Sequence, residues 1–169
     1  RNIYIVELVI KLVEDNRQVI VLSDRRAHCE YLMNETQKLG IRTGLYMGGM
    51  KQEALKQSEE MQVIFATFSL AQEGLDIPKL DSLILASPKT DVVQACGRIM
   101  RETTGKQNHP LIIDLCDQYS ILKSQAQKRR TFYKKSGFIV KTETKVEGKK
   151  KVKAADDIDI SSYLFTDES

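Results

Sequence analysis

Apolar residues follow two kinds of pattern that alternate along the chain. Residues 2–14 carry Val6, Val9 and Val13 at spacings of three and four among polar positions, which is typical of an amphipathic helix. Residues 18–22 form a short apolar run rich in β-branched side chains, which is typical of a buried strand. Because both patterns recur over most of the chain, the sequence predicts helices and strands in alternation.

The predicted helices cover residues 2–14, 25–39, 51–60, 91–101 and 117–136. The predicted strands cover residues 18–22, 41–47, 63–66, 83–86, 111–115 and 138–146, with residues 149–152 as a candidate hairpin partner for the last. Ser23 and Asp24 are expected to cap the second helix, and Gly40 to end it. Continuous apolar strands between helices predict an α/β fold, in which helices cover both faces of a parallel sheet.

The 169 residues, 41% of them apolar, are enough to bury the core of one domain. We expect a compact lobe over residues 1–146 and a charged tail or hairpin over residues 147–169. No apolar run approaches the ~20 residues that a membrane-spanning helix needs, so no membrane partner is expected. The chain begins with Arg1 and shows no signal peptide, which predicts a piece of a longer intracellular protein, cytoplasmic or nuclear.

The cysteines and histidines indicate neither a disulfide framework nor a metal centre. Cys29, Cys96 and Cys116 lie far apart and form no CxxC pair, so we expect three buried free thiols. With two histidines in the whole chain, no metal site is expected.

Basic residues gather near the end of a nearly neutral chain. Residues 1–122 hold 14 Lys and Arg against 16 Asp and Glu, residues 123–153 hold 12 against 2, and residues 154–169 hold 0 against 5. The last predicted helix is a basic helix, with Lys123, Lys128, Arg129, Arg130, Lys134 and Lys135. These side chains either contact a polyanion or are ordinary solvated charge, whereas Phe132 and Tyr133 are expected to pack.

Two polar segments follow neighbouring predicted strands. Thr67 directly follows residues 63–66, and its hydroxyl and backbone N–H suit a phosphate. In the second segment, Arg98 and Arg101 share one face of the predicted helix, one turn after Gln94. Paired guanidinium groups match phosphate oxygens, although incidental solvated arginines would give the same pattern. Because ligands bind at the carboxyl ends of parallel strands, both segments are expected there.

Three stretches resemble the motifs of one enzyme family. ATFSLAQEGLDIP (residues 66–78) resembles motif V of superfamily 2 helicases and translocases, QACGRIMR (residues 94–101) resembles motif VI, and QVIVLSDRRAHCEYL (residues 18–32) resembles motif IV. The resemblance covers roughly residues 1–140 and implies the second RecA-like lobe of such an enzyme. The branch most resembled is the DNA-directed one that includes repair, phage and large-DNA-virus helicases, so a viral source is one option.

This resemblance implies roles for residues of two sites. Arg98 and Arg101 correspond to the arginine fingers that stabilise charge on the γ-phosphate of ATP. Gln94 corresponds to a residue that contacts the nucleotide or organises those arginines. Gly74 and Asp76 are implied to face ATP and the other lobe. Thr67 is implied to bind a backbone phosphate, and the remaining implied nucleic-acid-binding residues are Ser23, Asp24, Arg25, Met47, Gly48 and Gly49.

The 169 residues contain no GxxxxGK[ST] loop, and no predicted strand is followed by an Asp-Glu pair that would hold magnesium. ATP and Mg²⁺ are therefore expected to be held mainly by an N-terminal lobe of the same protein, and these residues alone to be inactive. The expected function is that of the C-terminal motor lobe of an ATP-dependent DNA helicase or translocase, with DNA and the N-terminal lobe as partners. The alternatives are an RNA helicase lobe and a non-catalytic nucleic-acid-binding or docking module of RecA-like shape.

Overall fold

The computed structural model describes residues 1–73, 75–99, 108–116, 120–144 and 164–166. Its helices are α1 (Asn2–Glu14), α2 (Arg26–Gln37), α3 (Gln52–Glu59), α4 (Phe68–Glu73), α5 (Val93–Ile99) and α6 (Ser120–Lys135). Its strands are β1 (Val19–Ser23), β2 (Thr43–Tyr46), β3 (Val63–Thr67), β4 (Ser82–Leu85), β5 (Leu111–Asp114), β6 (Thr142–Thr144) and β7 (Leu164–Thr166).

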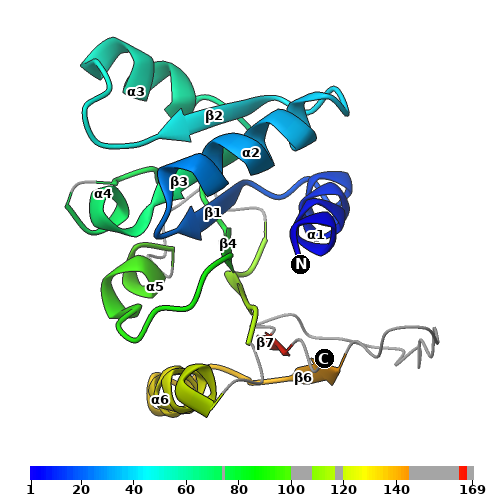
Figure 1. Ribbon diagram of the computed structural model, residues 1–169, viewed down its shortest axis with the longest axis vertical. Coiled ribbons are helices and arrows are strands. Elements are labelled where there is room, and N and C mark those ends of the chain that lie inside the picture. The colour runs from blue at the N-terminus through cyan, green and yellow to red at the C-terminus, as the bar shows by residue number, and fades with distance from the viewer. Residues whose placement is uncertain (74, 100–107, 117–119, 145–163, 167–169) are drawn as a thin grey trace.

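Five strands form one parallel sheet in the order β2-β3-β1-β4-β5 (Figure 1). The central strand β1 pairs with β3 on one side and β4 on the other, with Val19 opposite both Val63 and Ser82. From β1 the chain moves to the β2 edge of the sheet, and afterwards it returns strand by strand to the β5 edge. Because crossovers between parallel strands are right-handed, this reversal places helices on both faces, as predicted.

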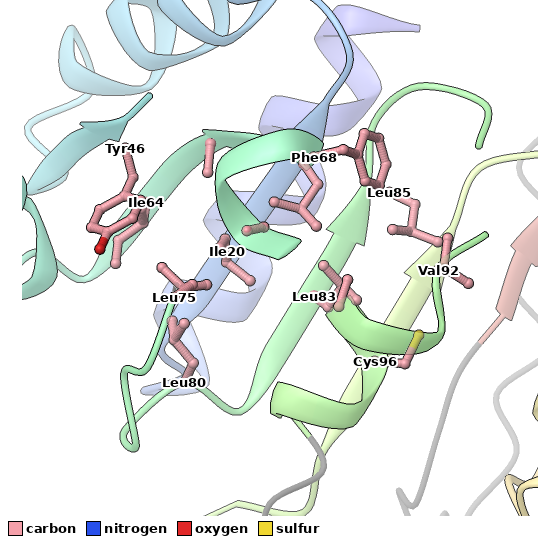
Figure 2. Packing of buried hydrophobic residues seen from close by; sticks show 14 of the residues in the cluster. Ile20, Tyr46, Ile64, Phe68, Leu75, Leu80, Leu83, Leu85, Val92 and Cys96 are labelled. Atoms are coloured by element: carbon pink, nitrogen blue, oxygen red, sulfur yellow. The ribbon is translucent and has the colours of Figure 1, made fainter. Parts of the chain in front are cut away.

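Each face of the sheet carries its own apolar core. On one face, α3, α4 and α5 pack over Ile20, Leu22, Ile64 and Leu83, as Figure 2 shows for α4 and α5. On the other face, α1 and α2 cover residues of the opposite strand parity, including Val21 and Phe65. Every residue of β1, β3, β4 and β5 is buried, which explains their continuous apolar sequence.

The start of α2 differs from the predicted cap. The N-cap is Arg25, without a side-chain cap hydrogen bond, and Ser23 belongs to β1, where it pairs with Thr67. Ser23 and Asp24 therefore do not cap α2, because the backbone of Ser23 already belongs to the sheet. Its hydroxyl instead accepts the backbone N–H of Arg25 at 3.3 Å. Gly40 follows α2 with a φ of +79°, which confirms it as the stop.

Two other segments also differ from the prediction. No helix was predicted within residues 67–78, but Phe68 and Ala71 share a buried face and fold α4 onto the core. Of the predicted strand 138–146, residues 142–144 form β6, which pairs in parallel with β7, whereas residues 138–141 are not in a strand and residues 145–146 lie outside the described residues. Phe138 and Val140 instead pack against the first core. The expected hairpin partner, residues 149–152, lies outside the described residues. In the part of the chain that the structure describes, no helix is long and apolar enough to span a membrane.

Candidate functional site

The carboxyl edge of the sheet brings together residues from three segments predicted to bind nucleic acid. Ser23 ends β1 directly beside Thr67, which ends β3. The loop after β2 joins them, because the Nη1 of Arg26 donates to the carbonyl oxygen of Gly48 at 2.6 Å. Gly49 turns this loop with a φ of +81°, in the region that favours glycine.

The predicted edge residues do not all expose their side chains. Asp24, Arg25, Gly48 and Gly49 are exposed. Ser23 and Met47 are 0% and 2% exposed, and Met47 packs in the core under α2. Their buried side chains therefore support the edge, and contacts with a nucleic-acid strand would come from their exposed neighbours. Thr67 is also buried, with its Oγ1 3.3 Å from the Oγ of Ser69.

A cleft of about 760 Å³ opens where the ends of β1 and β4 meet the first turns of α1 and α2. Its polar lining includes Asp24, Arg25, His28, Ser87 and Gln125. Burial, followed by the nearby positive charge of Arg1 and Arg25, lowers the pKa of His28 below its ordinary value of 6.5. The ring lies between the Oγ of Ser23 at 2.8 Å and the Oδ1 of Asn2 at 3.0 Å. A neutral His28 therefore orders this wall of the cleft.

A second surface is formed by α4 and α5, which lie side by side on one face of the sheet (Figure 1). The Oδ1 of Asp91 accepts the backbone N–H of Val93 at 3.1 Å and fixes the start of α5. Val92, Ala95 and Cys96 bury their side chains in the core (Figure 2). Gln94 is therefore left on the exposed side, with the backbone of Arg98 one helical turn later.

Only some of the residues predicted to bind the nucleotide lie in the described part of the chain. Asp76 is exposed beyond α4, whereas Gly74 and Arg101 lie outside the described residues. The first polar segment was predicted at the carboxyl edge of the sheet. Its beginning, Thr67, lies there, but the part around Asp76 does not. Leu75 and Leu80 are buried along the face of the sheet, and the backbone N–H of Asp81 donates to the Gln18 carbonyl, just before β1 begins. Residues 75–80 thus run from the carboxyl edge toward the amino edge.

Thiols and possible metal ligands offer no further chemistry at these surfaces. Cys29, Cys96 and Cys116 are buried and free, as predicted. Burial raises the pKa of Cys29 to about 11 and the pKa of Cys96 and Cys116 to about 12, so the thiols stay protonated. Within the described ranges, no group of three or more His, Cys, Asp and Glu residues could hold a metal ion.

Helix α6 is held against the carboxyl edge by a buried ion pair. The Nε and Nη2 of Arg129 donate to the two carboxylate oxygens of Asp114 at 2.7 and 2.8 Å. The hydroxyl of Tyr133 donates to the same carboxylate at 3.1 Å, and the Nη1 of Arg129 donates to the Lys89 carbonyl oxygen at 2.6 Å. Arg129 is thus neither solvated charge nor a surface contact, in contrast to the prediction for the basic helix.

The model of the helicase conserved C-terminal domain matches residues 3–103, more than half of the sequence. This chain belongs to that family. The helicase lobe is 33% identical over 142 residues to a candidate ATP-dependent RNA helicase, L396 of Acanthamoeba polyphaga mimivirus, covering 82% of this chain and 27% of that protein. It is 35% identical over 100 residues to the uncharacterised protein 108L of Invertebrate iridescent virus 3, covering 59% of this chain and 89% of that protein.

Solved structures place the helicase lobe in the same fold. It matches the Escherichia coli DEAD-box protein SrmB, solved bound to regulator of ribonuclease activity A, with a TM-score of 0.57 and 25% identity. The match covers 72% of this chain and 75% of that chain. The five-stranded parallel sheet is therefore RecA-like, as the motif resemblance implied. The chain spans about a quarter of the length of the mimivirus relative.

Sequence reasoning missed several residues that organise the edge of the helicase lobe. Lys89 and Ser87 follow β4, and each contacts Asp24 after β1: Lys89 Nζ lies 3.1 Å from Asp24 Oδ1, and Ser87 Oγ accepts the Asp24 backbone N–H at 2.8 Å. The rule that pointed to Thr67, a polar residue directly after a buried strand, applies equally to the segment after residue 86. Arg129 gave no comparable signal, because its partner is 15 positions away.

Proposed function

We propose that this chain is the second motor lobe of an ATP-dependent helicase or translocase. The observation that supports this most is that one lobe carries two distinct surfaces. The residues implied to bind nucleic acid gather at the carboxyl edge, while Asp76, Gln94 and the backbone of Arg98 lie with α4 and α5 on one face of the sheet. A motor lobe needs both surfaces, one for the strand and one for the shared ATP site.

On the face formed by α4 and α5, Arg98 and Arg101 would act as arginine fingers. Their guanidinium groups would stabilise the negative charge that develops at the γ-phosphate during hydrolysis. Gln94 would contact the nucleotide or orient the two arginines, and Gly74 and Asp76 would face ATP and the partner lobe. Gln94 and Asp76 both expose polar side chains, which suits this role. ATP and Mg²⁺ would be held mainly by the N-terminal lobe, so these 169 residues alone would not hydrolyse ATP.

At the carboxyl edge, contacts to the sugar–phosphate backbone would hold one strand. Arg25 supplies an exposed guanidinium group, and Gly48 and Gly49 expose backbone where a phosphate can approach closely. Thr67 would contribute its hydroxyl or its backbone N–H. Such contacts carry no sequence information, so binding would be salt-sensitive and independent of sequence. Closure and reopening of the two lobes would then move this grip along the strand.

Two polynucleotides are candidates for the tracked strand. The motif resemblance is to the DNA-directed branch, which supports DNA. The name of the mimivirus relative, a candidate RNA helicase, supports RNA. A non-catalytic nucleic-acid-binding or docking module is the competing function, and protein 108L supports it, because the match to this chain takes in 89% of that short protein.

The test is steady-state ATP hydrolysis by the parent protein carrying both lobes, with single-stranded DNA, single-stranded RNA of equal length, or neither. We expect hydrolysis to rise with at least one strand, which also identifies the polynucleotide, and we expect none from the 169-residue chain alone. If neither strand stimulates the parent protein while the 169-residue chain still binds one of them, the motor is contradicted and the binding module is favoured.

A further inference from the structure

Lys89 lies at the carboxyl edge between two of the predicted nucleic-acid-binding segments. It follows β4, and its Nζ is 3.1 Å from the Oδ1 of Asp24, which follows β1. The same ammonium group lies 5.4 Å from the ring centroid of Phe68, the residue after Thr67 at the end of β3. Lys89 therefore places a positive charge at the centre of the edge, although no motif resemblance assigns it a role.

Both partners of this ion pair are held in place by bonds that do not involve the pair itself. The Lys89 carbonyl oxygen accepts the Nη1 of Arg129 at 2.6 Å, and Arg129 is anchored by Asp114 in the interior. The backbone N–H of Asp24 donates to the Oγ of Ser87 at 2.8 Å. If the carboxylate moved aside, the backbone of Lys89 would therefore stay in place, and the Phe68 ring would still lie beside the ammonium group.

The pair is exposed enough to be exchanged. The side chains of Lys89 and Asp24 are 34% and 45% exposed, and ion pairs at such sites contribute only ~0–1 kcal/mol. A backbone phosphate carries the same single negative charge as the Asp24 carboxylate and offers oxygen acceptors of the same kind. Asp24 itself cannot attract a phosphate, because like charges repel. A carboxylate on this edge therefore opposes binding of a nucleic-acid strand in two ways, by repelling its phosphates and by occupying the ammonium group of Lys89.

We propose that Lys89 binds a backbone phosphate of the polynucleotide, and that Asp24 competes with that phosphate for the ammonium group. Asp24 thus acts as a built-in phosphate mimic that weakens the grip on the strand, and it is not a strand contact. This inference rests on the proposed function, since it assumes that the carboxyl edge binds nucleic acid. It adds Lys89 to the residues that bind the nucleic-acid strand. It also makes Asp24 a residue that weakens this binding, whereas the motif resemblance implied a residue that contributes to it.

The experiment measures binding of fluorescently labelled single-stranded dT and U oligonucleotides to the 169-residue chain over a series of salt concentrations. The variants are Asp24→Ala, Lys89→Met and the double variant, and Met keeps the apolar stem over Phe68. Glu35→Ala and Lys38→Met are the matched controls. Lys38 and Glu35 form an exposed ion pair at the far end of α2, with Nζ and Oε1 2.6 Å apart. Their substitutions change the net charge by the same amounts as the substitutions of Lys89 and Asp24.

We expect Asp24→Ala to tighten binding by up to about fivefold, the value of a surface ion pair, beyond any effect of Glu35→Ala. Lys89→Met should weaken binding and reduce the slope of log K against log salt by about 1. In the Lys89→Met background, Asp24→Ala should tighten binding less than it does in the wild-type chain, because only the direct repulsion remains to be removed.

Equal effects of Asp24→Ala and Glu35→Ala, or of Lys89→Met and Lys38→Met, would overturn this inference while leaving the motor proposal intact, provided the wild-type chain binds in a salt-dependent way. If the wild-type chain binds neither oligonucleotide at low salt, the proposed grip on the strand fails and the inference falls with it. A loss of thermal stability in Asp24→Ala without any gain in affinity would assign the pair a purely structural role.

Discussion

Arg129 illustrates how little the charge of a residue says about its place in the fold. It belongs to a run of basic residues on α6, yet it is 2% exposed and forms a two-bonded pair with Asp114. The surrounding protein supplies two further partners, the hydroxyl of Tyr133 on Asp114 and the carbonyl of Lys89 on Arg129. A buried charge with its hydrogen bonds satisfied is tolerated, whereas a buried charge that has lost its partner is not.

We predict that Arg129→Ala destabilises the fold by about 3–5 kcal/mol, because it leaves the Asp114 carboxylate buried and unpaired. Urea unfolding of the 169-residue chain measures this loss. Arg130→Ala is the matched control at the next position, where the side chain is only partly buried and donates a 3.4 Å hydrogen bond to the Thr142 hydroxyl. Its effect should stay within about 0.5 kcal/mol. Similar losses for the two variants would mean that the buried pair does not anchor α6.

The position of Arg129 could not be predicted from the sequence, because it depends on how α6 docks. Among the six basic residues of α6, nothing local singles out the one that meets a carboxylate at the end of β5. The packing of Tyr133 was predicted correctly, since an aromatic residue on a periodic helix is more often buried than exposed. At the scale of single residues, the sequence therefore predicted apolar burial better than it predicted polar partners.

At the scale of elements, strand and helix patterns located most of the fold. The bounds of α1 were predicted to the residue, and the five strands of the main sheet lie within a few residues of the predicted ranges. The errors fall where local pattern is weak. Helix α4 is short and lies inside residues 66–78, the segment that resembles motif V, for which no helix was predicted. Strands β6 and β7 hold three residues each, and their paired residues are 22 positions apart (Thr142 and Leu164), so no local pattern predicts the pairing.

The packing of α3 on β2 leads to a prediction at this scale. A Cβ added to Gly44 would lie 2.8 Å from both the Cα and the Cβ of Ser58, so helix and strand are in backbone contact. We predict that Gly44→Ala destabilises the fold by about 1–3 kcal/mol, because α3 has to move away from the sheet. Thermal or urea unfolding of the 169-residue chain reports this change.

Gly48 provides the matched control for Gly44. A Cβ added there meets nothing within 4 Å among the described residues, and its backbone is not in the left-handed region. Gly48→Ala should therefore leave stability almost unchanged. If Gly44→Ala were equally neutral, α3 would not be in close contact with β2.

At the scale of the whole molecule, the lobe separates two sites whose polar segments were both predicted at the same edge of the sheet. Both polar segments were expected at the carboxyl edge, and Thr67 does lie there, at the end of β3. Asp24 and the loop with Gly48 lie at the same edge, after β1 and β2. The sequence alone could not show that α4 and α5 form a surface away from that edge, because this depends on the path that residues 75–80 take across the sheet. The pairing of Asp24 with Lys89, 65 positions away, is likewise a product of the fold alone.

Gly97 is also consistent with a contact between α5 and another lobe. A glycine allows a neighbouring backbone to approach closely, yet a Cβ at Gly97 would meet nothing within 4 Å in the described part of this chain. Gly97 is exposed on α5, directly before Arg98. In the proposed two-lobed enzyme, the group that approaches Gly97 would be the backbone of the N-terminal lobe or the nucleotide bound to that lobe.

The most direct test of this account compares Arg98→Ala and Arg101→Ala with the wild type in the parent protein carrying both lobes. ATP turnover in the presence of a stimulating strand and the affinity for ATP are measured on the same samples. Arg42→Ala is the control, because Arg42 is exposed before β2, near the amino edge. We predict that each finger variant loses roughly a thousandfold or more in turnover while ATP binding is largely kept and Arg42→Ala behaves as wild type. Unchanged turnover in both variants would contradict the composite ATP site and the motor that depends on it.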